Sequence, residues 1–70
     1  MLRNGLYTAN LQLRGTTYEV EIFTVVSERE GEKHLHNFRT FLESFKPSQD
    51  VSGLIEADGV IFRFRTLASA

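Results

Sequence analysis

Residues 6–26 read LYTANLQLRGTTYEVEIFTVV, and the pattern of this stretch decides the fold. Apolar and polar side chains alternate along residues 6–14 and again along residues 17–26, which is the period of a strand with one buried face. The side chains that share this face are Tyr7, Ala9, Leu11 and Leu13 in the first run and Tyr18, Val20, Ile22, Thr24 and Val26 in the second. The stretch therefore predicts two paired strands of one sheet.

The dipeptide Gly15–Thr16 separates these two runs. Glycine at the first central position suits a type II′ turn, because that position takes a positive φ. This turn pairs Leu13 with Tyr18, and every apolar side chain of the shared set then falls on the same face. The sequence thus predicts an antiparallel hairpin with a defined register.

A second hairpin is predicted near the end of the chain, with strands at residues 51–57 and 60–66. The dipeptide Asp58–Gly59 between them is a strong signal for a type I′ turn. This turn pairs Gly53 with Phe64, and the glycine leaves room for the phenylalanine ring. One face of this hairpin again collects the apolar side chains.

Between the hairpins the period changes to that of an amphipathic helix, which we expect over residues 31–45. Ser27 and Glu30 have the spacing of a capping box, but Gly31 would weaken a first turn placed there. Pro47 is expected to end the helix. The apolar side chains of the helix, all expected to be buried, are Leu35, Phe38, Phe41, Leu42 and Phe45.

These elements predict a single α+β domain spanning residues 1–70, in the order β-β-α-β-β. The simplest packing lays the helix on one face of a four-stranded sheet. A β-grasp arrangement, with the first and last strands parallel at the centre, fits this order. In element order alone the chain resembles the small immunoglobulin-binding domains of streptococcal type, and fold does not carry function. The stretch Tyr18–Pro47, which ends in FLESFKP, is similar to the closing strand and helix of the PsbP group of proteins, from whose pattern the second hairpin departs.

The composition narrows the classes of function. Eight basic and nine acidic residues give a net charge of −1, which argues against a protein that mainly neutralises phosphate backbones. Cysteine is absent, so disulfides, thiol chemistry and cysteine-ligated zinc are excluded. No apolar run approaches the roughly 20 residues of a membrane helix. Residues 1–5 lack the apolar core of a secretory signal, so we expect a cytoplasmic protein that does not bind membranes.

An apolar patch is expected on the sheet face that the helix leaves open, which in a one-helix domain should be polar. Its residues are Leu6, Phe23, Val25, Leu54 and Ile61. Exposed apolar patches commonly mark partner surfaces, and a 70-residue chain without disulfides gains stability by self-association. We therefore expect a protein-interaction or regulatory module that acts through this face or a sheet edge, as a homo-oligomer or with another protein.

Arg14, Arg63 and Arg65 support an alternative interpretation, a nucleic-acid-binding module. However, strand alternation sends Phe62 and Phe64 into the core, so these aromatic rings and the outward arginines do not share a surface. The favoured expectation is that Arg63 and Arg65 form cross-strand ion pairs. The acidic residues that can pair with these arginines are Glu19, Glu21 and Glu56.

No constellation in the sequence indicates catalysis. His34 and His36 are the only histidines, and on a helix their spacing separates the two rings by about 200°. We expect neither to bind a metal. The chain has no glycine-rich phosphate loop and no serine in a nucleophile-elbow context, and no cleft is expected beside Glu19 and Glu21. The sequence thus predicts a protein without cofactor or enzymatic activity.

Overall fold

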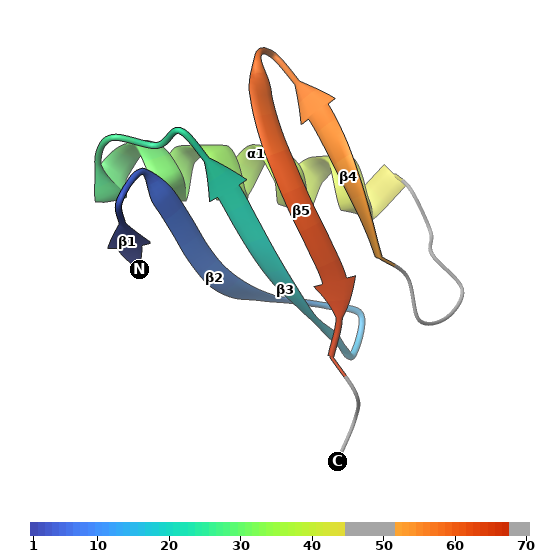
Figure 1. Ribbon diagram of the computed structural model, residues 1–70. Helices are drawn as coiled ribbons and strands as arrows, with labels where there is room; N and C mark the ends of the chain where they lie inside the picture. Colours follow the sequence, from blue (N-terminus) through green and yellow to red (C-terminus); the bar gives the residue numbers. More distant parts are fainter. Residues whose placement is uncertain (45–51, 68–70) are drawn as a thin grey trace.

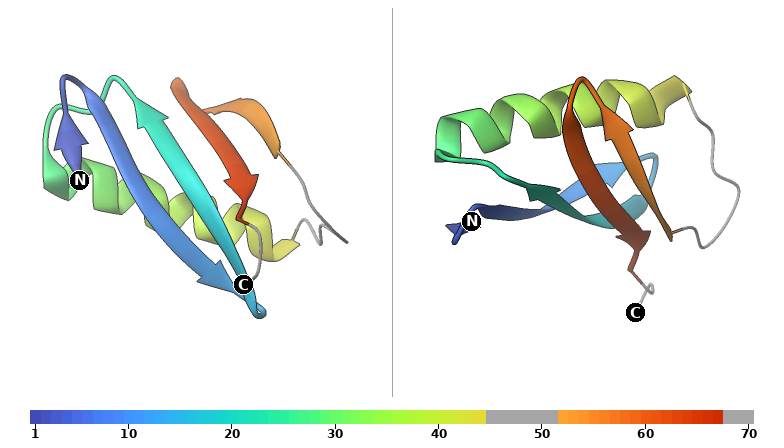
Figure 2. Two further views of the ribbon diagram at one scale, coloured as in Figure 1. Left: turned by 60° about the horizontal axis from the view of Figure 1, so that its bottom comes forward. Right: turned by 45° about the horizontal axis from the view of Figure 1, so that its top comes forward.

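One helix lies on one face of an antiparallel sheet, and the opposite face of the sheet points away from it (Figure 1, Figure 2). The computed structural model describes residues 1–44 and 52–67. The elements in chain order are β1 (Leu2–Arg3), β2 (Leu6–Leu13), β3 (Thr16–Phe23), α1 (Glu28–Ser44), β4 (Ser52–Ala57) and β5 (Val60–Thr66). The predicted α+β class, with one helix packed on a sheet, is confirmed.

Within the described residues the sheet has five strands in the order β1-β2-β3-β5-β4, where four were predicted. The additional strand is β1, which folds back on β2 through a turn at Asn4 and Gly5, both with positive φ (52° and 78°). The β-grasp arrangement is wrong, because β5 pairs antiparallel with β3 and every pairing in the sheet is antiparallel.

The turn between β2 and β3 lies one residue earlier than predicted. Arg14 and Gly15 have φ of 53° and 78°, the pattern of a type I′ turn, whose twist matches that of the flanking strands. Leu13 therefore faces Thr16, and the predicted pairing of Leu13 with Tyr18 is wrong. Each partner moves by two residues, so every side chain keeps its face of the sheet.

The second hairpin has the predicted register. Asp58 and Gly59 form its turn with φ of 53° and 76°, and Gly53 faces Phe64 across the strands. A Cβ atom at Gly53 would lie 3.1 Å from the Phe64 ring, so the glycine does leave the room that the ring needs. Position 51, the predicted start of this hairpin, lies outside the described residues.

Helix α1 begins at Glu28, three residues before the predicted start. The Ser27 hydroxyl accepts a hydrogen bond from the Glu30 amide (3.1 Å), which caps the first turn. Gly31 stands inside the helix because the Tyr7 ring packs against it, and a Cβ atom there would overlap Tyr7 Cδ2. The predicted helix end at Phe45 and Pro47 is outside the part of the chain that the structure describes.

The core lies between α1 and the three central strands. Phe38 is its centre on the helix side, stacked on Phe62 with ring centroids 4.9 Å apart and tilted against Phe64 at 5.3 Å. Phe41 was expected in this core but is 43% exposed, because it lies on the flank of the helix. The buried hydrophobic residues are Tyr7, Leu11, Leu13, Tyr18, Val20, Ile22, Val25, Phe38, Leu42, Phe62 and Phe64.

Strand β3 ends at Phe23, whereas alternation predicted a strand through position 26. Thr24 has a φ of 61°, a conformation that a β-branched residue rarely adopts, and it reverses the inside–outside order of the next two residues. Val25 then turns inward, with 1% of its surface exposed and its amide donating to Gly5 O (2.9 Å). Val26 is 80% exposed, so the predicted inward side chains at 24 and 26 are wrong.

Candidate functional site

The outer face, which is the sheet face turned away from α1, is built by alternation along the four long strands. Its side chains are Leu6, Thr8, Asn10 and Gln12 of β2; Thr17, Glu19, Glu21 and Phe23 of β3; Ser52, Leu54 and Glu56 of β4; and Ile61, Arg63 and Arg65 of β5. No element within residues 1–44 or 52–67 covers this face. It therefore offers a broad, nearly continuous strand surface.

An apolar corner occupies one end of the outer face. Leu6 and Phe23 face each other across β2 and β3, and both are half-buried. Ile61 near the start of β5 is 41% exposed, and Leu54 on β4, which faces Arg63, is 64% exposed. The structure thus brings together four of the five predicted interface residues. The fifth, Val25, was wrongly assigned to this face, since it is buried in the core.

A charged ladder lies beside the apolar corner, with glutamates on β3 and arginines on β5. Arg65 Nε donates to Glu19 Oε1 at 2.8 Å, and the Arg63 guanidinium binds Glu21 Oε1 through both Nε and Nη2. The predicted cross-strand ion pairs are confirmed for these four residues. Each pair is substantially exposed, so it adds only a few tenths of a kcal/mol to stability.

Arg63 also lies over the Phe23 ring, with its Cζ atom 5.8 Å from the ring centroid. This is within the range of a cation–π contact. Phe62 and Phe64 point into the core as expected. The aromatic ring that shares the outer face with Arg63 is instead that of Phe23, on the neighbouring strand β3.

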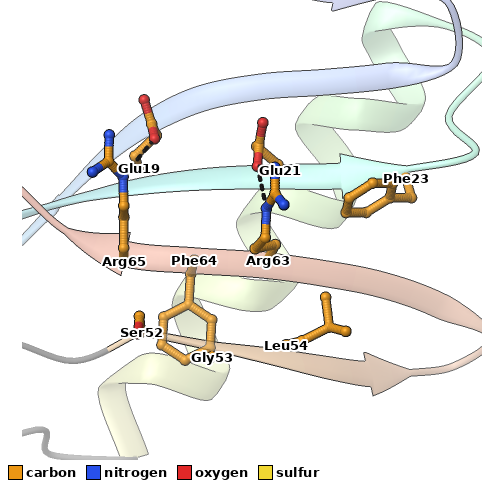
Figure 3. Close-up of a pocket in the computed structure, with 9 residues that line it drawn as sticks. All are labelled: Glu19, Glu21, Phe23, Ser52, Gly53, Leu54, Arg63, Phe64 and Arg65. Atoms are coloured by element: carbon orange, nitrogen blue, oxygen red, sulfur yellow. Dashed lines mark hydrogen bonds and ion pairs between the residues drawn. The ribbon is translucent and has the colours of Figure 1, made fainter.

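A shallow groove of about 750 Å³ runs between the charged ladder and β4 (Figure 3). Its wall on one side is the row of ion pairs, and on the other side lies Leu54. The residues that line it are Glu19, Glu21, Phe23, Ser52, Gly53, Leu54, Arg63, Phe64 and Arg65. The absence of a cleft beside Glu19 and Glu21 was therefore wrongly predicted, because both residues line this groove.

Arg14 is separated from the other two arginines of the predicted nucleic-acid site. It lies in the turn between β2 and β3, and its Nη2 atom donates to Glu43 O near the end of α1 (3.0 Å). Arg63 and Arg65 project from the outer face instead. The three arginines therefore do not form one basic surface.

The two histidines lie apart, as their helical spacing predicted. His34 Nε2 is 3.9 Å from Glu30 Oε1, and the ring meets Phe62 edge-on at 6.5 Å between centroids. His36 is exposed. Within the described ranges, no group of three or more metal-ligating side chains is assembled. No helix among the same residues is both long and apolar enough to cross a membrane.

A second groove, of about 410 Å³, separates α1 from the β4–β5 hairpin. Its residues are Lys33, His34, Asn37, Phe38, Phe41, Ile55, Ala57, Asp58 and Phe62. Strand alternation carries no signal for this groove, because it depends on the direction in which the helix crosses the sheet (Figure 1).

Comparison with known proteins finds no matching family model, no similar curated protein and no similar solved structure.

Proposed function

We propose that this protein is a small non-catalytic protein-interaction module that binds its partner through the outer face. The observation that carries the proposal is the apolar corner formed by Leu6, Phe23, Leu54 and Ile61. Leu54 and Ile61 are 64% and 41% exposed, which gives them apolar surface to bury against another protein. Exposed apolar groups that gather on one face commonly mark such a contact.

The surroundings of the apolar corner suit a protein partner. Protein interfaces combine an apolar, aromatic-containing centre with a polar rim. Phe23 supplies an aromatic side chain, and Arg63 stacks over it at 5.8 Å. The ladder of ion pairs and the polar side chains Thr8 and Asn10 extend the face beyond the apolar corner. A partner that binds the outer face can therefore bury apolar side chains and form hydrogen bonds on the same surface.

The alternative of nucleic-acid binding is favoured by one feature, the cation–π contact between Arg63 and Phe23. Single-stranded nucleic acids are bound by aromatic stacking platforms within positively charged grooves. Here the groove carries no net positive charge, because Arg63 and Arg65 are matched by Glu21 and Glu19. We therefore place nucleic acid second to a protein partner.

The experiment that tests the proposal is affinity capture from the cells that make the protein, with identification of bound proteins by mass spectrometry. The variant Leu54→Glu changes the most exposed residue of the apolar corner. Val26→Glu is the matched control, since it makes the same kind of change at an 80% exposed valine outside the outer face. We expect Leu54→Glu to reduce capture at least about tenfold, equivalent to 1.4 kcal/mol of binding free energy, and Val26→Glu to leave it unchanged.

Circular dichroism of each variant confirms that the fold is retained. If wild type, Leu54→Glu and Val26→Glu capture the same proteins in the same amounts, and self-association is equal in all three, the outer face is not the binding surface.

A further inference from the structure

The charges of the outer face are sorted by strand. Both glutamates of the charged ladder stand on β3 and both arginines stand on β5, at matching levels along the sheet. Glu21 faces Arg63, and Glu19 faces Arg65 one step further along. β3 and β5 are adjacent strands at the centre of the described sheet. The face therefore carries a negative row and a positive row side by side.

Such a pattern is self-complementary under one particular rotation. Consider two copies whose outer faces pack against each other, related by a two-fold axis that lies between the two faces, runs parallel to the strands and passes between β3 and β5. This axis places β3 of one copy over β5 of the other, and β2 of one copy over β4 of the other. A second copy placed by this axis sets its Glu21 over Arg63 of the first copy. Its Glu19 likewise lies over Arg65. The negative row of each copy thus meets the positive row of the other.

The same rotation also places uncharged side chains of similar polarity over each other. Phe23 of one copy lies over Ile61 of the other, because these residues occupy the same end of β3 and β5. Asn10 stands level with Ser52 in the sheet, so the rotation also places polar groups over polar groups. Apolar contacts therefore form at one end of the interface and polar contacts at the other.

The side chains that the rotation brings together from β2 and β4 are less complementary than those from β3 and β5. The rotation sets Thr8 over Leu54, where the threonine methyl group offers an apolar contact, and Leu6 over Glu56. The pairing of Leu6 with Glu56 is the clear mismatch, and it lies at the rim of the interface.

The competing two-fold axis, perpendicular to the strands, gives the opposite result. It lays β3 of one copy over β3 of the other, and therefore glutamates over glutamates. Juxtaposed like charges across an interface cost several kcal/mol. The strand-sorted charges thus favour the parallel axis over the perpendicular one.

We infer that the partner of the outer face is a second copy of this chain, packed face to face about the two-fold axis parallel to β3 and β5. Two-fold dimers are the commonest assemblies of identical chains, and face-to-face packing of sheets is a stable architecture. The apolar corner of each copy is then buried, which gives a domain without disulfides additional stability. This inference rests on the proposed function, since it names the partner of the same surface.

The test uses a charge-swapped chain that carries Glu19→Arg, Glu21→Arg, Arg63→Glu and Arg65→Glu. The swap keeps both ion pairs within the chain and leaves the net charge unchanged. Under the parallel axis the swapped chain pairs with itself as the wild type does. Mixed with the wild type, however, it sets arginine over arginine and glutamate over glutamate.

The measurement is native mass spectrometry of isotope-labelled wild type mixed with the swapped chain after dilution and re-concentration. We expect dimers of each chain alone, with the mixed dimer at least about tenfold below its statistical proportion, a ratio that corresponds to 1.4 kcal/mol. A mixed dimer at or above the statistical proportion overturns the inference, because the perpendicular axis predicts that result. A folded swapped chain that stays monomeric while the wild type dimerises also overturns it.

If the fourfold swap fails to fold, the pair Glu21→Arg and Arg63→Glu provides the same comparison with a smaller change. A wild type that is monomeric throughout the concentration range removes the second copy as partner. In that case, capture of a different protein that Leu54→Glu abolishes leaves the proposed function standing. Failure of the inference and failure of the proposed function are thus separate results.

Discussion

Gly31 and Tyr7 form a close contact between the helix and the sheet. The Tyr7 ring lies where a side chain at position 31 would begin, and Tyr7 is only 5% exposed. A helical glycine costs about 1 kcal/mol relative to alanine. Glycine is nevertheless required at position 31, because a larger residue would push α1 away from β2. The sequence pattern showed a weak helix start at Gly31, whereas the structure shows a close approach of two elements.

We predict that Gly31→Ala lowers the free energy of unfolding by about 1–3 kcal/mol, the usual cost of overpacking a core. Helix propensity alone would give a gain of about 1 kcal/mol, so the two effects have opposite signs. Urea unfolding followed by circular dichroism measures the difference. Glu32→Ala, at the exposed next position, serves as the control and should change stability little. A more stable Gly31→Ala protein would show that Tyr7 does not pack against the helix backbone.

Tyr7 also predicts how stability depends on alkaline pH. Burial raises the pKa of the Tyr7 hydroxyl above its ordinary value of 10, and Glu32 and Glu28 raise it further. Above pH 10 the unfolded chain therefore releases this proton while the folded chain still holds it, so the free energy of unfolding falls as pH rises. Below pH 10 the effect is absent.

In Tyr7→Phe this titration is removed, and we expect a shallower loss of stability than in the wild type as the pH rises above 10. Thermal melts across that range provide the measurement. Equal slopes for the two proteins would mean that the Tyr7 hydroxyl is solvated in the folded state.

At the scale of elements, only some of the apolar residues predicted on one face of α1 are buried in the core, and another lies at its edge. Phe38 and Leu42 are 2% and 0% exposed, whereas Phe41 is 43% exposed. All three satisfy the helical period, so periodicity alone does not rank them. The helix packs against β2 and β3, and the direction of its crossing decides which of its apolar residues lies over the aromatic side chains of β5.

The two phenylalanines of α1 therefore differ in their predicted contribution. Phe38→Ala should lower the free energy of unfolding by about 3–5 kcal/mol, the cost of truncating a buried aromatic residue. Phe41→Ala should lower it by less than half as much, because Phe41 already exposes 43% of its surface. Parallel denaturant titrations of the two variants test this ranking. Equal losses would place Phe41 in the core and contradict the crossing described for α1.

At the scale of the whole molecule, the balance of charge decides which ligands the outer face attracts. The chain carries a net charge of −1, and Arg63 and Arg65 are each matched by a glutamate. Phosphate backbones are bound mainly by unbalanced basic charge, and such binding weakens steeply with salt. The ion pairs therefore act against nucleic-acid binding where Arg63 meets the half-buried Phe23 ring.

We predict that the wild type does not bind a single-stranded oligonucleotide in fluorescence anisotropy at about 50 mM salt. Glu19→Gln with Glu21→Gln releases both arginines and changes the net charge from −1 to +1. This double variant should acquire weak binding that disappears as salt is raised. Wild-type binding with a steep salt dependence would instead favour the nucleic-acid alternative.

Several features of this protein could be predicted from its sequence because they depend on neighbours along the chain. Strand alternation assigned Tyr18, Val20 and Ile22 to the buried face, and the same rule placed Arg63 and Arg65 on the outer face. The Asp58–Gly59 turn determined the second hairpin together with its register. The dipeptide Asn4–Gly5 is a turn signal of the same kind, and it could have revealed β1.

The tertiary structure decided what no local pattern contains. Antiparallel pairing of β3 with β5 set glutamates beside arginines and brought Phe23 next to Ile61. The positive φ of Thr24 turns Val25 into the core and away from the outer face. The direction in which α1 crosses the sheet places Phe41 at the edge of the core. Alternation is a local property, because it follows from the backbone geometry of each strand. Strand order and helix direction instead depend on contacts between residues far apart in the chain, and those contacts assembled the apolar corner and the charged ladder into one surface.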